Sequence, residues 1–286
     1  MTIPIDDSLK DRVILITGGS RGFGWFIAQR LLEGGAKVIL TASRSANQLK
    51  DVNEKAKGIA GADHCLTIQA DVANWNDCQR TVDAVLNAFG KIDVLINNAG
   101  KGSSEYRVTM DSTSTRFWDI PVESWRSIIE TNLTGTFQMT KAVIPTMIEQ
   151  KQGKIFSIST SLTTMIGTGL SPYGASKAGL EAAHVVWARE LKNDGIDVNI
   201  LLPGGASDTD FIPQVMVAGE VGKRVGPTNR LLPGDVIVPP AVYLCTDATK
   251  GITGRRIIAK FWDHDLPAAD AFTKCLQPQH EHPEIM

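Results

Sequence analysis

The sequence predicts a doubly wound α/β protein, in which helices cover both faces of one parallel β-sheet of about seven strands. Between residues 12 and 260, short β-branched runs alternate with longer segments of helical period, which is typical of βαβ units. In the segment Gly22–Glu33, for example, Phe23, Ile27 and Leu31 recur at helical spacing. Such a helix carries an apolar stripe that can face the sheet.

Seven short runs are predicted as strands. In chain order they are 13–16, 38–41, 66–69, 94–96, 154–158, 198–201 and 256–259. The 286 residues contain no internal repeat and no low-complexity linker, so we expect residues 1–286 to form a single domain.

Two long connections interrupt the alternation, and both are predicted to lie on the ligand side of the sheet. Residues 101–120 follow the fourth strand, and residues 208–232 follow the sixth. Connections of this length are usually functional, and open α/β sheets bind ligands at the carboxyl ends of their strands. After the last strand the pattern ends, and residues 263–286 are expected to form a C-terminal extension with a polar tail.

The composition argues against several functional classes. The 29 basic and 31 acidic residues give a net charge of −2 without a block of like charges, so nucleic acid is not an expected partner. The N-terminus does not resemble a secretory signal, and no apolar run reaches transmembrane length, so no membrane association is expected. The four cysteines match neither a zinc pattern nor a disulfide framework. We therefore expect a cytoplasmic protein without a bound metal.

A glycine-rich turn between the first strand and the first helix predicts a pyrophosphate site. Glycines allow a sharp turn and a close approach of the backbone, and the positive end of the helix attracts phosphate. Rossmann-type folds bind dinucleotides in this strand-turn-helix context. The residues predicted to contact the cofactor here are Thr17, Gly18, Ser20, Arg21, Gly22, Phe23 and Gly24.

The end of the second strand favours NADP(H) over NAD(H). A carboxylate at this position binds the adenosine ribose of NAD, whereas a cation accommodates the extra phosphate of NADP. The sequence has no acidic residue there, and Ser43, Arg44 and Arg21 can together bind a 2′-phosphate. The alternative is that Arg44 is an ordinary solvated surface charge.

Tyr173 and Lys177 are predicted to lie on one face of a helix, four residues apart. A free tyrosine, with a pKa of about 10, is a poor acid or base at neutral pH, and a nearby cation is expected to lower that pKa. Tyr173 can then exchange a proton with a substrate oxygen while Lys177 tunes it.

With these residues and several other motifs in the same order, the chain resembles the short-chain dehydrogenase/reductase family, in the branch marked by TGxxxGxG and YxxxK. The resemblance covers about residues 11–260. The motifs are Thr17–Gly24, Asp71–Val72, Asn97–Gly100, Asn132, Tyr173 with Lys177, and Pro203–Gly204.

The resemblance implies hydride transfer between a nicotinamide and a carbonyl or alcohol carbon. By this resemblance Tyr173 is the general acid in reduction and the base in oxidation. Lys177 holds the nicotinamide ribose and lowers the Tyr173 pKa, and Asn132 places a water behind Lys177. Further cofactor contacts are implied for Asp71 and Val72 at the adenine, Asn98, Ala99 and Gly100 along the cleft, and Pro203, Gly204, Ala206 and Thr209 near the nicotinamide amide.

One departure from the family concerns the substrate oxygen. The family normally has a serine thirteen residues before the tyrosine, where its hydroxyl binds the substrate carbonyl. Thr160 stands at that position, and its hydroxyl can donate the same bond if χ1 permits. A bulge of one residue at the strand end would place Ser161 there instead. Register favours Thr160, and both residues stay candidates.

Two further departures concern the substrate side and the assembly. The connection between Gly100 and Asn132 is longer than usual, so the segment holding Tyr106, Arg107, Phe117 and Trp118 is expected to add a wall to the pocket. The glycine pair usual after the last strand is absent, in a region that commonly contributes to the tetramer interface or to the substrate pocket. A homo-oligomer, either a dimer or a tetramer, is still expected.

The sequence thus predicts an NADP(H)-dependent oxidoreductase that interconverts a ketone or aldehyde and an alcohol on a small-molecule substrate. The rival hypothesis is an NADP-sensing or scaffolding protein with little turnover, which Thr160 at the serine position keeps open. His184 is predicted to be a packing residue, and His280 and His282 are expected to be solvated tail residues rather than metal ligands.

Overall fold

The computed structural model describes residues 7–43, 46–106, 115–209 and 231–278. Seven strands form one sheet in the order β3-β2-β1-β4-β5-β6-β7, and every neighbouring pair is parallel. The strands are β1 (Val13–Ile16), β2 (Lys37–Ala42), β3 (Cys65–Gln69), β4 (Val94–Asn97), β5 (Gly153–Ile158), β6 (Ile196–Leu202) and β7 (Arg256–Ile258). The predicted doubly wound α/β fold is confirmed, and each predicted strand lies within two residues of an observed one.

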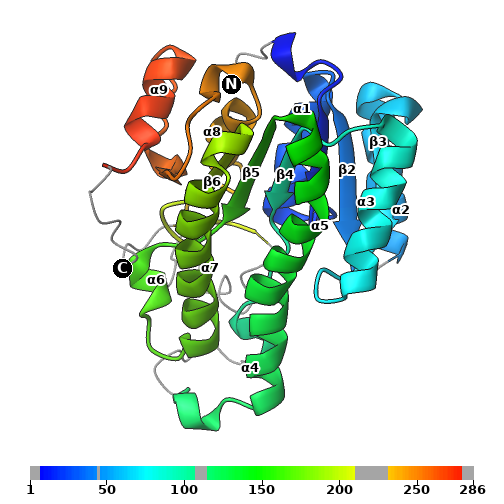
Figure 1. The fold of residues 1–286 in the computed structure, drawn as a ribbon. Helices are drawn as coiled ribbons and strands as arrows, with labels where there is room; N and C mark the ends of the chain where they lie inside the picture. The colour runs from blue at the N-terminus through cyan, green and yellow to red at the C-terminus, as the bar shows by residue number, and fades with distance from the viewer. Residues whose placement is uncertain (1–6, 44–45, 107–114, 210–230, 279–286) are drawn as a thin grey trace.

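Helices cover the sheet on both sides (Figure 1). One face carries α1 (Gly22–Glu33), α2 (Ala46–Ala60), α8 (Val238–Leu244) and α9 (Ala268–Cys275), and the other carries α3 (Trp75–Phe89), α5 (Gly135–Gln150) and α7 (Ser171–Glu190). Two shorter helices, α4 (Val122–Ile129) and α6 (Leu162–Met165), pack against α7. None of the helices in the described ranges is both long and apolar enough to cross a membrane.

Both faces of the sheet are buried, which explains the continuous apolar runs of the strands. In β1, Ile14 and Ile16 belong to the core on the α1 side, whereas Val13 and Leu15 belong to the core on the α3 side. Successive side chains of a strand point to opposite faces, so a strand covered on both sides is apolar at most positions, and β1 is apolar at all four. The two cores together hold the sheet rigid beneath the site.

The strand order reverses between β1 and β4, which are neighbours in the sheet. Ile14 pairs with Val38 of β2 on one side and with Val94 of β4 on the other. The chain leaves β1 toward α1 on one face and continues after β4 toward helices on the opposite face. Such a reversal opens a crevice at the carboxyl ends of the strands, where ligands bind in folds of this type.

The chain after β7 contains a helix that was not predicted from the sequence. Helix α9 lies in the segment that was expected only as a C-terminal extension, and its Phe272 and Cys275 side chains are fully buried. The Phe272 ring lies 5.1 Å from the Tyr243 ring of α8. Leu276 then forms an antiparallel bridge with Ile257 of β7. The extension is therefore part of the core up to this point, while the predicted polar tail at 279–286 lies outside the described residues.

Candidate active site

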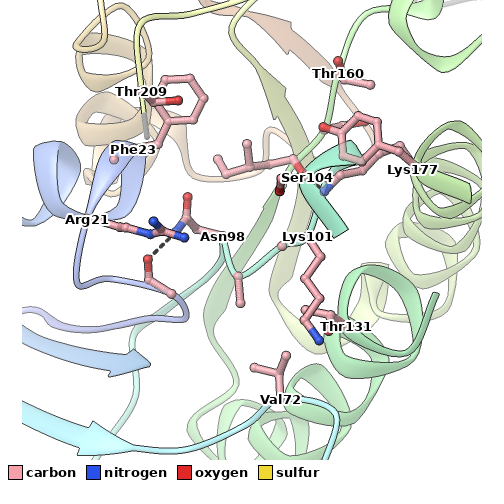
Figure 2. A pocket seen from close by; sticks show the side chains of 18 of the residues that line it. Arg21, Phe23, Val72, Asn98, Lys101, Ser104, Thr131, Thr160, Lys177 and Thr209 are labelled. Carbon is pink, nitrogen blue, oxygen red and sulfur yellow. Dashed lines mark hydrogen bonds between the residues drawn. The ribbon is translucent and has the colours of Figure 1, made fainter. Parts of the chain in front are cut away.

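A cavity of about 410 Å³ opens at the carboxyl ends of the strands. Figure 2 shows Arg21, Phe23 and Thr209 on one side of it and Thr160 and Lys177 on the other, with Asn98 and Lys101 between them. The predicted residues that line it are Gly18, Ser20, Arg21, Gly22, Phe23, Ser43, Asp71, Val72, Asn98, Ala99, Gly100, Thr160, Tyr173, Lys177, Pro203, Ala206 and Thr209. Most of the predicted site residues are thus gathered around one space.

The glycine turn after β1 packs directly against the end of β4. Gly18 has a positive φ of 64°, and a Cβ atom there would lie 2.8 Å from the Ala99 Cα. A Cβ atom on Gly24 would lie 2.6 Å from the Asn98 Nδ2. That Nδ2 donates hydrogen bonds to the carbonyls of Thr17 and Gly18, at 2.9 and 2.8 Å. Side chains at Gly18 and Gly24 would therefore force β1 and β4 apart, and glycine keeps the turn closed.

The N-terminus of α1 faces this turn and is suited to an anion. Arg21 is the N-cap residue in an extended conformation, and its side chain makes no capping hydrogen bond. The first N–H groups of a helix have no partner within the helix, and the helix dipole makes this end positive. The glycine cradle and the helix end together fit the pyrophosphate of a dinucleotide.

The ends of β2 and β3 form the other part of this cavity wall. Thr41, Ala42 and Ser43 line it, and no acidic side chain is among them. Asp71 is held in a turn, because its Oδ1 accepts a hydrogen bond from the Ala73 N–H at 3.0 Å. Arg44, predicted to bind a 2′-phosphate, lies outside the described residues. Within those residues, no cluster of three or more His, Cys, Asp or Glu side chains forms a candidate metal site.

Helix α7 places Tyr173 and Lys177 on the same face at the cavity, as the spacing predicts. The Lys177 Nζ lies 5.8 Å from the centre of the Tyr173 ring and donates a hydrogen bond of 2.7 Å to the Ile158 carbonyl. Burial lowers the pKa of Lys177 to about 8, and the nearby Glu181 carboxylate partly offsets this shift. The helix therefore holds a buried ammonium group at the end of β5.

The direction of the Tyr173 pKa shift differs from the prediction. Burial raises the pKa of this phenol to about 12, and a hydrogen bond with the Thr160 side chain lowers it only in part. The spacing on the helix predicts that Lys177 lowers this pKa, but the spacing contains no information on the desolvation of the phenolate. In the ligand-free protein Tyr173 is therefore a protonated phenol at neutral pH.

The two candidate hydroxyl groups at the end of β5 have different surroundings. Ser161 is the N-cap residue of α6, and its Oγ accepts a hydrogen bond from the Thr164 N–H at 3.3 Å and pairs with the Thr164 hydroxyl. Thr160 lines the cavity, and its side chain is hydrogen-bonded to Tyr173. The structure thus brings Thr160, rather than Ser161, beside the phenol.

Asn132 is fully buried in a π-helical turn, Glu130–Thr134, which joins α4 to α5. Its Oδ1 accepts a hydrogen bond from the Lys101 N–H at 2.7 Å, and its Nδ2 donates to the Lys101 carbonyl and to the Ser176 Oγ at 2.9 and 3.0 Å. A π-turn inside a helix often marks a functional position. Here it connects the segment after β4 to the helix that carries Tyr173.

Several predicted residues support the cavity without lining it, and they are Thr17, Gly24, Asn132, Ser161 and Gly204. The Thr17 Oγ1 accepts hydrogen bonds from the Asn98 and Ala99 N–H groups, at 3.1 and 3.0 Å. Gly204, with a φ of 91°, packs so closely on Lys260 that a Cβ atom would lie 2.7 Å from its side chain. These residues fix the backbone segments from which the lining side chains project.

The sequence of this chain matches a known protein family over most of its length. The model of the family described as short chain dehydrogenase matches residues 12–216. This chain is a short-chain dehydrogenase/reductase. It is an oxidoreductase that acts on CH–OH or C=O groups.

Relatives within this family are similar along most of their length. A 3-oxoacyl-[acyl-carrier-protein] reductase of Synechocystis sp. is 37% identical over 198 residues, which are 69% of this chain and 75% of the relative. The FabG 3-oxoacyl-[acyl-carrier-protein] reductase of Salmonella typhimurium is 33% identical over 255 residues, covering 87% of this chain and 96% of the relative. A crystal structure of a short-chain type dehydrogenase/reductase from Mycobacterium marinum has a TM-score of 0.77 at 26% identity and covers 90% of this chain and 97% of that one.

In this dehydrogenase/reductase, only part of the long connection after β4 lines the cavity. Residues 101–105 line the cavity, whereas Phe117 and Trp118 are 70% and 67% exposed and do not. The expected wall is therefore wrong for Phe117 and Trp118, and Arg107 lies outside the described residues. The Tyr106 hydroxyl instead donates a hydrogen bond of 2.7 Å to the Gly169 carbonyl, which ties this connection to the segment before α7.

Sequence reasoning also missed lining residues outside the family motifs. They are Thr41, Ala42, Gln48, Ala70, Thr131, Ile158, Ser159, Thr164, Leu170, Gly205 and Ser207. Thr131 had a detectable signal because it directly precedes Asn132, and its Oγ1 is buried in the structure without a hydrogen-bond partner. Gln48 and Leu170 gave no signal, since only the folded chain brings them to the cavity.

Proposed function

We propose that the protein is an NADP(H)-dependent oxidoreductase that interconverts a ketone or aldehyde and an alcohol, with Tyr173 as the proton-transferring residue. One observation carries the proposal: Tyr173, its hydrogen-bond partner Thr160 and the Lys177 ammonium lie in the same cavity as the glycine cradle. A pyrophosphate site and a proton donor in one space are what a nicotinamide-dependent reduction requires. The nicotinamide, when bound, supplies or accepts the hydride.

The protonated phenol of Tyr173 suits it as the general acid of the reducing direction. It can donate its proton to the substrate oxygen as negative charge develops there. The Thr160 hydroxyl, which is hydrogen-bonded to Tyr173 in the ligand-free protein, can turn its one proton to the same substrate oxygen when substrate binds. Two converging donors would both orient the carbonyl and stabilise the developing charge.

Lys177 is proposed to hold the nicotinamide ribose and to favour the phenolate that proton transfer leaves on Tyr173. Its Nζ donates one hydrogen bond to Ile158 and has two further protons for other acceptors. Asn132 is proposed to orient this region by fixing Lys101 and Ser176. A neutral residue at position 177 would leave the developing phenolate without a compensating charge.

The preference for NADP(H) over NAD(H) is part of the proposal. Support comes from the wall at the end of β2, where Thr41, Ala42 and Ser43 provide no carboxylate for a ribose 2′-hydroxyl. Arg21 lines the same cavity and can face a 2′-phosphate. Arg44 is proposed as the second cation on the strength of its position in the sequence alone.

The substrate is proposed to be a small carbonyl compound, and a 3-oxoacyl thioester is the first class to test. The relatives named as 3-oxoacyl-[acyl-carrier-protein] reductases support this choice. Residues 101–120 and 208–232 are proposed as the substrate side, since residues 101–105, Ser207 and Thr209 line the cavity. Residues 107–114 and 210–230 of these connections lie outside the described residues. A homo-oligomer is also proposed, because Phe137 of α5 and Val186 of α7 expose 46% and 48% of their area.

The test is a fluorescence titration of the purified protein with NADPH and with NADH, followed by an NADPH-oxidation screen. The screen covers ketones, aldehydes, quinones and 3-oxoacyl thioesters. We expect tighter binding of NADPH than of NADH, and turnover of at least one carbonyl class. Tight NADPH binding without turnover across the panel would contradict the proposal and favour an NADP sensor.

A further inference from the structure

A partly buried ion pair lies next to the candidate site, between two residues that no family motif includes. Glu181 stands on α7 one helical turn after Lys177, and Arg256 begins β7. The Arg256 Nε lies 3.0 Å from the Glu181 Oε2, and the two side chains are 22% and 7% exposed. An isolated buried ion pair adds little net stability, because desolvation of the charges opposes their attraction. The pair is therefore more important for the segments that it holds in place than for the stability of the fold.

Both partners bind the end of β5, where the candidate hydroxyl stands. The Arg256 Nη2 donates a hydrogen bond of 3.0 Å to the Thr160 carbonyl. The Ser159 hydroxyl donates to the Glu181 Oε1 at 2.5 Å. Two consecutive residues of the strand end are thus fixed, one through its backbone and one through its side chain. This fixes the backbone from which the Thr160 side chain reaches Tyr173.

The guanidinium group also connects the strand end to the C-terminal segment. The Arg256 Nη1 donates a hydrogen bond of 2.7 Å to the Gln277 Oε1, beyond α9. The planar fork of arginine thereby satisfies acceptors from three different segments at once, which a lysine cannot do. Arg256 is therefore placed by the rest of the fold rather than by Glu181 alone.

The carboxylate of Glu181 also affects the charge of Lys177. Burial favours neutral Lys177, and Glu181 favours its ammonium form. Other groups near Lys177 are Tyr173 and His184 on the same helix and the Ile158 carbonyl of β5, and Glu181 itself is paired with Arg256 of β7. The His184 ring is neutral near pH 7, since burial lowers its pKa to about 4. Glu181 is thus the negative group that supports Lys177.

We propose that Glu181 and Arg256 are positioning residues for catalysis: they fix the end of β5 that carries Thr160 and place a carboxylate one turn from Lys177. This inference rests on the proposed function for the roles of Thr160 and Lys177. Neither residue touches the reacting atoms in the proposed mechanism, because both act through Thr160 and Lys177. Loss of the Glu181 charge should change the titration of Lys177, whereas loss of the Arg256 hydrogen bonds should displace Thr160.

The first experiment replaces Glu181 by glutamine, which keeps the shape and removes the charge. The readout in the ligand-free protein is an NMR titration of lysines labelled at Cε, with the Lys177 signal assigned from the Lys177→Met variant. We expect the Lys177 signal to titrate at lower pH in Glu181→Gln than in the wild-type protein. With the substrate found in the screen, we expect kcat to fall about tenfold and its alkaline limb to move to lower pH.

The matched control is Asp197→Asn at the amino end of β6. Asp197 accepts a hydrogen bond from the Gly251 N–H, and its carboxylate lies 3.7 Å from a buried cation, Lys154. This pair is similarly buried but contacts neither Thr160 nor Lys177. A merely structural role for Glu181 predicts that both variants lose stability alike and that the Lys177 titration is unchanged. An unchanged titration in Glu181→Gln would overturn the inference.

Arg256→Lys is the second variant, and it tests the positioning role if Glu181→Gln does not fold. It keeps the positive charge but cannot bind Glu181, Thr160 and Gln277 together. We expect kcat to fall about tenfold, as a displaced catalytic group would cause, with cofactor affinity retained. Wild-type kcat in Arg256→Lys would contradict the inference. If the wild-type protein reduces no carbonyl compound, the proposed function fails, while the Lys177 titration still tests Glu181.

Discussion

Lys177 lies one helical turn after Tyr173, and its Nζ is 5.8 Å from the centre of the Tyr173 ring. Burial acts on both residues in the same sense, because it disfavours the charged form of each. The pKa of Lys177 is lowered to about 8 and that of Tyr173 is raised to about 12. The phenol therefore keeps its proton across the usual assay range, whereas the ammonium group does not.

The first prediction concerns the pH dependence of reduction. Lys177 loses its charge as pH rises through about 8, so we expect kcat to fall above that pH. Lys177→Met should lower kcat about 100-fold and abolish this limb. A pH profile of NADPH oxidation measures both effects, with thermal melts to check that the variant folds. An alkaline limb near pH 8 that persists in Lys177→Met would assign it to another group.

A second prediction separates the two hydroxyls at the end of β5. Thr160→Val removes the hydroxyl beside Tyr173 with little change of shape, and we expect kcat to fall about 100-fold. Ser161→Ala removes the cap of α6 and should cost about 1 kcal/mol of stability with little change in kcat. Thr160→Ser is the control and should remain active. The opposite order of the two effects would assign the carbonyl contact to Ser161.

The third prediction addresses the choice of cofactor. Arg44→Ala and Arg21→Ala should each weaken NADPH binding about 10- to 100-fold and NADH binding much less, because only NADPH carries the 2′-phosphate. Fluorescence titrations with both nucleotides measure this difference. Arg126→Ala on α4 is a control, since its side chain is 71% exposed. Equal losses for NADPH and NADH would refute the phosphate contact.

The fourth prediction concerns acid stability and the buried His184. Its Nδ1 lies 2.9 Å from the Leu180 carbonyl, and burial lowers its pKa from 6.5 to about 4. As pH falls below 6.5 the unfolded chain takes up a proton that the folded chain does not. The folded state therefore loses up to about 3 kcal/mol between pH 6.5 and 4.

We expect urea unfolding at pH 7 and pH 5 to reveal this loss in the wild-type protein and a smaller one in His184→Gln. His264→Gln, at an exposed position, serves as the control and should behave like the wild type. An equal loss of stability in the wild type and in His184→Gln would show that another group causes the acid sensitivity.

The architecture could be predicted because local patterns specify it. Strands buried on both faces are mostly apolar, so β1 was visible as a continuous apolar run. Helix α9 was missed although Ala268, Phe272 and Cys275 recur at helical spacing. Helix α9 has only eight residues and follows the last strand, so the strand-helix alternation did not predict it.

The candidate site could be predicted only in part, because motifs specify residues but not their surroundings. The spacing of Tyr173 and Lys177 predicted a shared helical face, but the pKa of Tyr173 depends on how much tertiary packing excludes water. Glu181 and Arg256 are 75 residues apart, and neither belongs to a motif. The fold alone makes them neighbours.

The most direct test of the central claim is NADPH oxidation by the wild-type protein and by Tyr173→Phe, on the substrate found in the screen. Fluorescence titration of both proteins with NADPH accompanies it, because the variant should bind the cofactor as the wild type does. We predict a loss of turnover of at least about 100-fold in Tyr173→Phe, since only the proton donor is removed. Turnover at the wild-type rate in this variant would contradict the account.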